Sequence, residues 1–450
     1  MKIFLTFFLL LIAAIPAAQA RDKILNIQDI RSPGGLTAWL VEDHSVPVVT
    51  VRFGFRGAGA LRDPDDRQGL ALMLSNTMDE GAGTLDSRAF HALLDDLSVT
   101  LRFSSSRDDF TGTLKTLTRN RDKAAELLTL ALTAPRFDAE AVDRMRAANQ
   151  SRIRTSLSDP DWAAARLLND VAFAGHPYAR NSGGTLTSLA AITPDDLRAF
   201  HKRFLGKANL YVGIAGDMTP AEAQAFLDQV FGGLPAGAAL PPASPAKLPD
   251  AAATVLYRMD IPQTVVQMIQ PGLQRKDPDY QAATVMNFIL GASGFGSRLT
   301  REGREKRGLT YGIYTSLMNM DYFDGLMLST STRNEKVAEM LALIGKEWKA
   351  MAERPVDTEE LASAKSYLIG AMPLGYTTTE DIASALLSLQ LGDLPIDQLE
   401  REMDGIEKTT AADVQRVAKR LLDTRKMTTI LAGAPEGIKD ARVVETLPNV

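Results

Sequence analysis

The segment "RDPDDRQGLALMLSNTMDEGAG" (residues 62–83) recurs in altered form as "KDPDYQAATVMNFILGASGFG" (residues 276–296). Each copy follows an apolar, strand-like run and is expected to form a helix that ends in glycines. The first copy predicts one amphipathic helix over residues 69–83, with an inner face made of Leu70, Met73, Leu74 and Thr77. The recurrence predicts that one structural unit is present twice in the chain.

Two further pairs of segments keep the same order. "FDAEAVDRMRAANQ" (residues 137–150) pairs with "VDTEELASAKSYLI" (residues 356–369), and Asp138 and Asp357 are candidate N-caps for the helices that follow. "LRAFHKRFLGKANLYVGIAGD" pairs with "VQRVAKRLLDTRKMTTILAGA", and each reads as a helix, a short break and an apolar strand. The sequence therefore predicts an α+β fold of two homologous halves, each a mostly antiparallel sheet with helices packed on one face.

The predicted boundaries divide the chain into four parts: a signal peptide (1–20), a first half (21–233), a Pro/Ala-rich linker (234–249) and a second half (250–450). The leader has Lys2, an apolar run, Pro16 and a small-x-small site at Ala18–Ala20, which indicates export and cleavage. The alternative is a membrane anchor, but the run is short for a span. We expect a periplasmic protein with no membrane span in the mature chain.

Composition narrows the classes of function. The 450 residues are 45% hydrophobic and 23% charged, which indicates fully packed cores. The net charge of −5 argues against nucleic acid as the main partner. Because the chain has no cysteine, disulfides, thiolate metal sites and cysteine nucleophiles are excluded.

Three segments in order resemble the pitrilysin/insulinase family of zinc peptidases, in its bacterial processing-peptidase-like branch: "HSVPVVTVRFGFRGAGALRDPDDRQGLA", "GHPYARNSGGTLTSLAAITPDDLRAFHKRF" and "SRLTREGREKRGLTYGIYT". The resemblance covers nearly the whole chain after the leader. It implies that the two halves form a clamshell and that the relatives hydrolyse peptide bonds.

In that family the first helix carries His-x-x-Glu-His, in which two histidines one turn apart bind zinc and the glutamate polarises a bound water. The matching positions here are Leu72, Ser75 and Asn76, and no carboxylate lies at residues 150–152, where the third ligand would fall. None of the four histidines, His44, His91, His176 and His201, has another at ligand spacing. We therefore expect no metal on this chain, and we expect Leu72 to be buried in place of a ligand.

The second half keeps a different family feature. Arg304 and Tyr311 match an Arg–Tyr pair that, by resemblance, binds the scissile carbonyl and stabilises its oxyanion. From the residues alone, the same segment also reads as a charged, solvated helix end. By resemblance, Leu101, Arg102, Phe103 and Ser104 lie on the strand that receives substrate as an added β-strand; an ordinary sheet strand is the equal alternative.

Three functions remain at the level of sequence. The first is the metal-free subunit of a two-chain zinc peptidase, with zinc on a homologous partner subunit, an extended peptide as substrate, and Arg304 and Tyr311 completing the partner's site. The second is a non-enzymatic peptide-binding or scaffold protein of the same fold. The third is a hydrolase with an unrelated centre, for which the sequence offers no paired motif.

Overall fold

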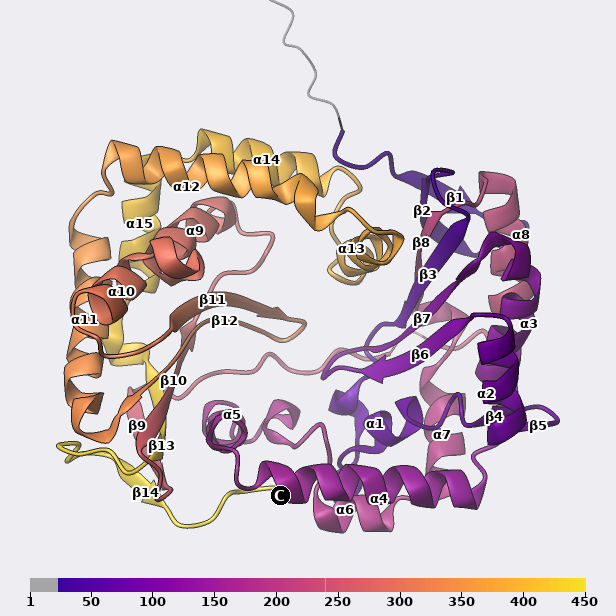
Figure 1. Cartoon of the computed structure of the whole chain (residues 1–450), viewed down its shortest axis with the longest axis horizontal. Coiled ribbons are helices and arrows are strands. Elements are labelled where there is room, and N and C mark those ends of the chain that lie inside the picture. Colours follow the sequence, from indigo (N-terminus) through magenta and orange to yellow (C-terminus); the bar gives the residue numbers. More distant parts are fainter. Residues whose placement is uncertain (1–22, 239) are drawn as a thin grey trace, which may run out of the picture.

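The computed structural model describes residues 23–238 and 240–450, so the predicted signal peptide lies outside the described residues. Two six-stranded sheets stand at opposite sides of the molecule, each backed by helices on its outer side (Figure 1). This is the two-half α+β clamshell that the sequence predicts.

The first sheet has the strand order β1-β2-β8-β3-β7-β6, and all its neighbours are antiparallel except β2 and β8. Its strands are β1 (Gln28–Arg31), β2 (Thr37–Glu42), β3 (Val48–Phe55), β6 (Thr100–Ser105), β7 (Phe110–Leu117) and β8 (Leu210–Gly216). A separate small hairpin joins β4 (Gly81–Ala82) and β5 (Leu85–Asp86).

The second sheet has the order β11-β12-β10-β13-β9-β14. Its strands are β9 (Ala253–Arg258), β10 (Gln263–Pro271), β11 (Ile313–Met320), β12 (Phe323–Arg333), β13 (Thr428–Gly433) and β14 (Arg442–Val444). Read from β6 and from β11, the two sheets place their counterpart strands in the same order, which confirms the internal duplication. They differ at the last strand, because β1 is antiparallel to β2 whereas β14 is parallel to β9.

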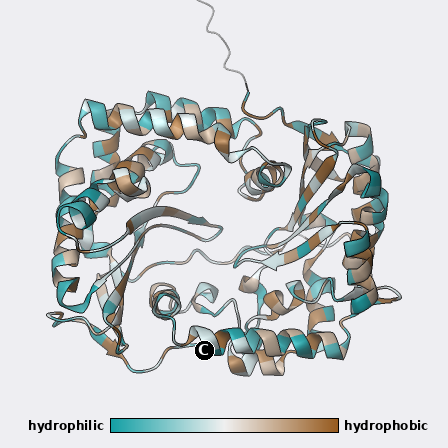
Figure 2. Ribbon diagram, viewed as in Figure 1, coloured by the Kyte–Doolittle hydropathy of each residue, from teal (hydrophilic) through white to brown (hydrophobic). Residues whose placement is uncertain are grey.

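The helices of the first half are α1 (Leu70–Ser75), α2 (Ser87–Asp96), α3 (Arg121–Thr133), α4 (Ala139–Ser156), α5 (Pro160–Ala172), α6 (Leu186–Ala191), α7 (Pro194–Phe204) and α8 (Pro220–Phe231). Those of the second half are α9 (Tyr280–Asn287), α10 (Arg298–Thr300), α11 (Val337–Glu353), α12 (Thr358–Ala371), α13 (Thr379–Leu391), α14 (Gln398–Lys408) and α15 (Ala411–Leu421). Hydrophobic residues gather on the strands, and hydrophobic and hydrophilic residues alternate along the surrounding helices (Figure 2). Burial of these apolar faces is the main stabilising contribution to each half.

Each half contributes one helix that packs on the sheet of the other half. The apolar face of α13 packs on the first sheet, where Ala383 and Leu386 are fully buried beside Ala215. In return, α5 packs on the second sheet, where Ala164 and Leu167 are buried beside Ile430. Because each of these helices covers part of the inner face of the other half's sheet, the halves cannot separate without exposing two apolar clusters.

The predicted linker residues form no helix or strand in their described part. The segment nevertheless touches both halves: the carbonyl of Pro241 accepts a hydrogen bond from Arg62 Nη2 at 2.7 Å, and the amide of Ala246 donates to the carbonyl of Tyr322 at 2.8 Å. The linker is therefore packed along the molecule rather than free in solvent.

The first helix of the repeat is shorter than the sequence predicts. The helix predicted over residues 69–83 ends at Ser75, because Ser75 Oγ and Thr77 Oγ1 donate to carbonyls of the preceding turn, to Leu72 at 2.8 Å and to Met73 at 2.7 Å. The chain then continues as turns to the hairpin at Gly81, whose φ is +106°.

The two predicted N-caps behave differently. Asp357 accepts a hydrogen bond from the amide of Glu360 at 2.7 Å and caps α12 as expected. Asp138 stands at the N-cap of α4 but makes no capping hydrogen bond, because its carboxylate pairs with Arg136 Nε at 2.6 Å. A local ion pair has replaced the cap in one copy of the repeat.

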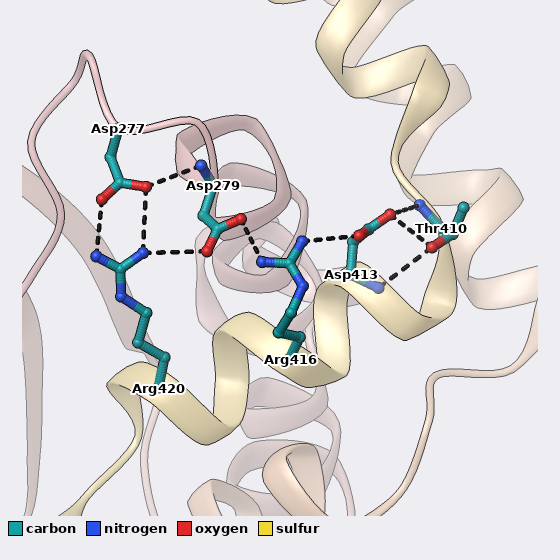
Figure 3. Close-up of polar contacts among 6 residues, drawn as sticks. All are labelled: Asp277, Asp279, Thr410, Asp413, Arg416 and Arg420. Carbon is teal, nitrogen blue, oxygen red and sulfur yellow. Dashed lines mark hydrogen bonds and ion pairs between the residues drawn. The ribbon is translucent and has the colours of Figure 1, made fainter.

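An ion-pair ladder fixes the start of α9 against α15 (Figure 3). Arg420 Nη2 lies 2.7 Å from Asp277, and its Nη1 lies 3.0 Å from Asp279; Arg416 bridges Asp279 and Asp413. The Arg420 guanidinium holds the pKa of the Asp277 carboxyl below its ordinary value. The ladder positions the second-half counterpart of α1.

No helix within the described residues is both long and apolar enough to cross a bilayer.

Candidate functional site

The start of α1 is held by a buried carboxylate. Asp63 is 2% exposed, and its two oxygens accept the amides of Gly69 at 2.8 Å and Ala71 at 2.9 Å. Burial raises the pKa of Asp63 to about 7, against these hydrogen bonds, which lower it. The helix that would carry a metal motif is thus firmly placed.

The three positions that match the zinc motif lie in or at the end of this helix. Ser75 is 3% exposed, and its hydroxyl is used within the helix. Asn76 is half-buried at the C-terminal end. Leu72 is also only half-buried, so the expectation that it is buried is wrong; the buried face of α1 consists of its neighbours Met73 and Leu74.

A polar cluster joins α1 to α4 where the resemblance would place the ligands. Asn76 Nδ2 donates to Asn149 Oδ1 at 3.1 Å, and Arg152 Nη1 donates to the same oxygen at 3.3 Å. In the second half the repeat places Met286, Leu290 and Leu368 at the positions of Leu72, Asn76 and Asn149; the first two are buried in the hydrophobic core and Leu368 packs against it. The first half therefore keeps amides and a cation where the second half is apolar.

These groups are not a metal site. Amide donors and a guanidinium repel a cation, and zinc in proteins takes histidine, cysteine or carboxylate ligands. Within the described ranges, no three His, Asp or Glu side chains gather as ligands. The four histidines have separate partners: His44 meets Asp217 at 2.6 Å, His176 the Ser244 carbonyl at 2.9 Å, His201 the Leu132 carbonyl at 2.9 Å, and His91 lies 3.8 Å from Glu80.

Arg304 lies in a π-helical segment, Arg301–Glu305, that follows α10. The neighbouring cations Lys306 and Arg307 pair with Glu302 at 2.6 and 2.7 Å and lower the pKa of its carboxyl to about 2. Arg304 makes no ion pair with any described residue; its guanidinium carbon lies 4.5 Å from the ring centre of Phe295. Most of the charge cluster is thus the charged, solvated helix end that the residues alone predict, but Arg304 does not take part in its ion pairs.

Tyr311 is 86% exposed and shares a pocket of about 380 Å³ with Arg304. The remaining lining residues all belong to the second half: Gln263, Gly308, Leu309, Thr310, Ser331, Thr332 and Arg333. In Figure 1, α10 lies at the left of the molecule, whereas α1 lies to the right of its centre, near the bottom. The structure therefore brings Arg304 and Tyr311 together, and it separates them from the positions of the lost zinc motif.

The predicted substrate strand, β6, is at the edge of the first sheet and pairs with β7 alone among the described strands. Leu101 and Phe103 are 5% and 9% exposed and pack in the core, whereas Arg102 and Ser104 are exposed on the opposite face. Ser104 Oγ lies 2.8 Å from Thr111 Oγ1.

Sequence reasoning missed a cluster where the two halves meet at the tips of counterpart hairpins. Tyr178 Oη donates to Asp108, whose other oxygen accepts the amide of Asp321 at 3.2 Å. Arg56 Nε lies 3.7 Å from Asp321. Burial raises the pKa of Asp109, next to this contact, to about 7. Acidic residues at the turn of each hairpin, "RDD" and "DYFD", were the available signal, but sequence does not show that the tips touch.

Comparisons with known proteins fit this description. The family profile described as "Insulinase (Peptidase family M16)" matches residues 39–185, and that described as "Peptidase M16 inactive domain" matches residues 191–368. A crystal structure of a peptidase M16 inactive domain from Pseudomonas fluorescens superimposes with a TM-score of 0.86 at 28% identity, over 93% of this chain and all of that chain. A protease from Helicobacter pylori, at 18% identity and a TM-score of 0.83, covers 91% of this chain and 99% of its own, and shows the fold alone.

Two curated relatives carry different names. The non-peptidase homolog YmxG from Helicobacter pylori is 27% identical over 391 residues, 86% of this chain and 89% of the relative. An uncharacterized zinc protease from Mycobacterium leprae is 24% identical over 397 residues, 87% of this chain and 88% of the relative. The relatives thus include chains named as peptidases and a chain named as a non-peptidase.

Proposed function

Because the chain belongs to the insulinase family of M16 peptidases, we propose that it is the metal-free subunit of a periplasmic two-chain zinc peptidase. In this proposal the zinc and the general base are on a homologous partner subunit. This chain supplies Arg304 and Tyr311, which bind the carbonyl of an extended peptide and stabilise its developing oxyanion. Export by the leader at residues 1–20 is part of the same proposal.

One observation carries the proposal: Arg304 and Tyr311 share one accessible pocket, and Arg304 has no acidic partner among the described residues, while the zinc-motif positions hold Leu72, Ser75 and Asn76. A guanidinium and a phenol at one pocket are hydrogen-bond donors suited to an oxyanion. The residues that line the pocket include no acid or histidine that could activate water. These donors can therefore assist hydrolysis only if a partner subunit provides the group that activates water.

The test starts with capture of the exported protein together with its bound partner. The complex is assayed on an unstructured peptide with and without a chelator. We expect chelator-sensitive cleavage, and we expect Arg304→Ala to lower kcat/KM on the order of a hundredfold, because an oxyanion donor is lost. Tyr311→Phe should lower kcat/KM about tenfold or more.

The matched controls are Arg301→Ala, in the same helical turn, and Tyr367→Phe, which is 63% exposed and outside the pocket. Both should leave cleavage unchanged. If the complex cleaves with unchanged kinetics in the Arg304 and Tyr311 variants, the pair has no role in catalysis and the proposal fails.

The second candidate is a peptide-binding or scaffold protein without a catalytic partner. The open edge of β6 favours it, because an unpaired strand edge can receive an extended peptide through main-chain hydrogen bonds. Recovery of no zinc-bearing homologue, together with peptide binding by the chain alone, would support this candidate over the first.

A further inference from the structure

We propose that the open edge of β6 selects extended peptides whose side chains on the α13 side of the sheet are acidic, and that Arg102 is the residue that selects them. This inference rests on the peptide-binding part of the proposed function. It requires neither a zinc-bearing partner nor Arg304 and Tyr311.

On its outer side, the backbone of β6 pairs with no other described strand, and the positions of its edge-facing groups follow from the register. The amide of Ser106 donates to the carbonyl of Asp109 at 2.8 Å, which makes these two residues a hydrogen-bonded pair at the hairpin turn. Hydrogen-bonded and non-hydrogen-bonded pairs alternate along an antiparallel ladder, and the register runs without interruption from Ser105 back to Thr100. The amides and carbonyls of Leu101, Phe103 and Ser105 therefore point to the open edge.

The side chains of β6 divide between two faces. Leu101 and Phe103 are buried among the helices of the first half. Arg102 lies on the other face, in one row with Thr113 of β7 and Arg52 of β3. That face is the one covered further along by α13, because Thr50 Oγ1, in the row of Lys115, lies 2.8 Å from Thr379 Oγ1 of α13.

The charge on this face is mostly positive. Arg102 is exposed and makes no ion pair or hydrogen bond with any described residue. Arg52 donates to Thr113 Oγ1, while its buried Nε has no hydrogen-bond partner among the residues that the structure describes. Lys115 lies 3.6 Å from Glu380, and the negative charge of Glu380 also favours the charged form of Arg52. Arg52 and Lys115 thus share the Glu380 carboxylate, and Arg102 pairs with no described acid.

The acids at the tip of the hairpin do not neutralise Arg102. Asp108 accepts hydrogen bonds from Tyr178 and from the amide of Asp321. Asp109 accepts the amide of Gly57 at 3.0 Å, and Asp321 faces Arg56. These carboxylates are engaged with the contact between the halves, so Arg102 remains available to a ligand.

A peptide strand added to this edge has a residue directly opposite Arg102 on the same face. Because Arg102 turns its own backbone groups toward β7, that residue would form a non-hydrogen-bonded pair with it, the closer of the two pair types. Opposite charges in such a pair are favourable, and like charges are unfavourable. An acidic side chain fits this position, and a basic one is rejected.

The experiment measures binding of fluorescent peptides of about ten residues to the full chain by anisotropy. Every second residue is Thr, and the others are all Glu, all Gln or all Lys, so that a slip of two residues along β6 keeps the same face toward Arg102. We expect the Glu peptide to bind about fivefold more tightly than the Gln peptide, and the Lys peptide more weakly still.

The variant Arg102→Glu should reverse this order. The matched control is Arg88→Glu, which changes the net charge equally at an exposed position on α2, on the helical side of the sheet; it should keep the order of the native chain. Equal affinity for the three peptides, or the same loss in both variants, would overturn the inference while leaving binding at the edge intact. If none of the peptides binds, both strand addition and its charge preference fail, whereas Arg304 and Tyr311 are tested separately by cleavage.

Discussion

Asn76 Nδ2 donates a hydrogen bond to Asn149 Oδ1 across 3.1 Å, and this contact joins the end of α1 to α4. In a zinc-bearing relative the same junction would join the ligands of one helix to the third ligand on the other. Here an amide pair, supported by Arg152, joins the two helices at this junction. The loss of the centre is therefore accommodated by hydrogen bonds between the same two helices.

The first prediction concerns metal binding. We expect neither the native chain nor the triple variant Leu72→His, Ser75→Glu, Asn76→His to retain stoichiometric zinc after dialysis, because the third protein ligand is missing. Addition of Arg152→Glu to the triple variant should produce zinc retention, since it replaces a cation of the cluster by a carboxylate. Metal analysis of the three dialysed proteins measures this. One zinc per native chain, or equal retention in triple and quadruple variants, would contradict it.

The second prediction concerns the exchanged helix α13. A Cβ on Gly213 of β8 would lie 2.7 Å from the carbonyl oxygen of Ala383 and 2.8 Å from the Leu386 Cβ. Gly213→Ala should therefore displace α13 and lower the free energy of unfolding by about 2–3 kcal/mol. The control Gly370→Ala, in α12 with nothing near the added Cβ, should be neutral or stabilising. Urea unfolding followed by tryptophan fluorescence compares them; equal midpoints would contradict the predicted cost of the added methyl group.

The third prediction concerns pH. Burial raises the pKa of Asp109 to about 7 from an ordinary value near 3.8. Between these values the folded chain holds a proton that the unfolded chain releases, so the stability contribution of this group falls as the pH rises toward 7. Asp109→Asn keeps an oxygen for the Gly57 amide without the charge. It should be more stable than the native chain at pH 8 by about 1–2 kcal/mol and similar at about pH 4, near the ordinary pKa of the carboxyl.

Thermal unfolding at the two pH values checks this expectation. Asp195→Asn serves as control, because its carboxylate is 93% exposed and pairs with Arg198 on the surface. If the stability of the native chain changes no more with pH than that of the Asp109 variant, then the loss of stability at high pH does not come from Asp109.

The fourth prediction compares two kinds of ion pair. In the ladder of Figure 3, Arg420 is 48% exposed, so Arg420→Ala should cost about 0.5–1 kcal/mol. Arg298 and Glu360 are only 14% and 19% exposed and pair through two nitrogens of the guanidinium, so Arg298→Ala should cost about 3 kcal/mol by leaving Glu360 unpaired. Chemical denaturation of both variants measures the difference, and the larger loss in Arg420→Ala would reverse the ranking.

The two halves show that equivalent positions in the sequence do not predict which side chains contact each other. The repeat pairs Asp65 with Asp279 and Arg203 with Arg420. In the second half Arg420 reaches Asp279, but in the first half Asp65 pairs with Arg180 at 2.6 Å, and Arg203 instead lies over the ring of Phe204. Equivalent positions thus keep the fold but not the partners, because a surface arginine can reach several acids at nearly equal energy.

The candidate site divides in the same way. The loss of the zinc motif at Leu72, Ser75 and Asn76 is legible from residue type, because neither an alkyl nor an amide side chain replaces a histidine ligand. That Arg304 leaves its charged neighbours and lies over Phe295, in the pocket of Tyr311, is a matter of three-dimensional distance. Sequence could supply the pair only through resemblance.

What the sequence alone determined was the repeat, the α+β class and the chemistry that the zinc positions cannot perform, since all three follow from local periodicity and residue type. The tertiary structure decided which sheet each helix covers: α5 and α13 are ordinary amphipathic helices by pattern, yet each is buried on the sheet of the other half. It also decided that the hairpin tips meet at Asp108 and Asp321. The physical reason is that hydrophobic burial is non-directional: a pattern shows that a face must be covered, and only the assembled packing shows by what.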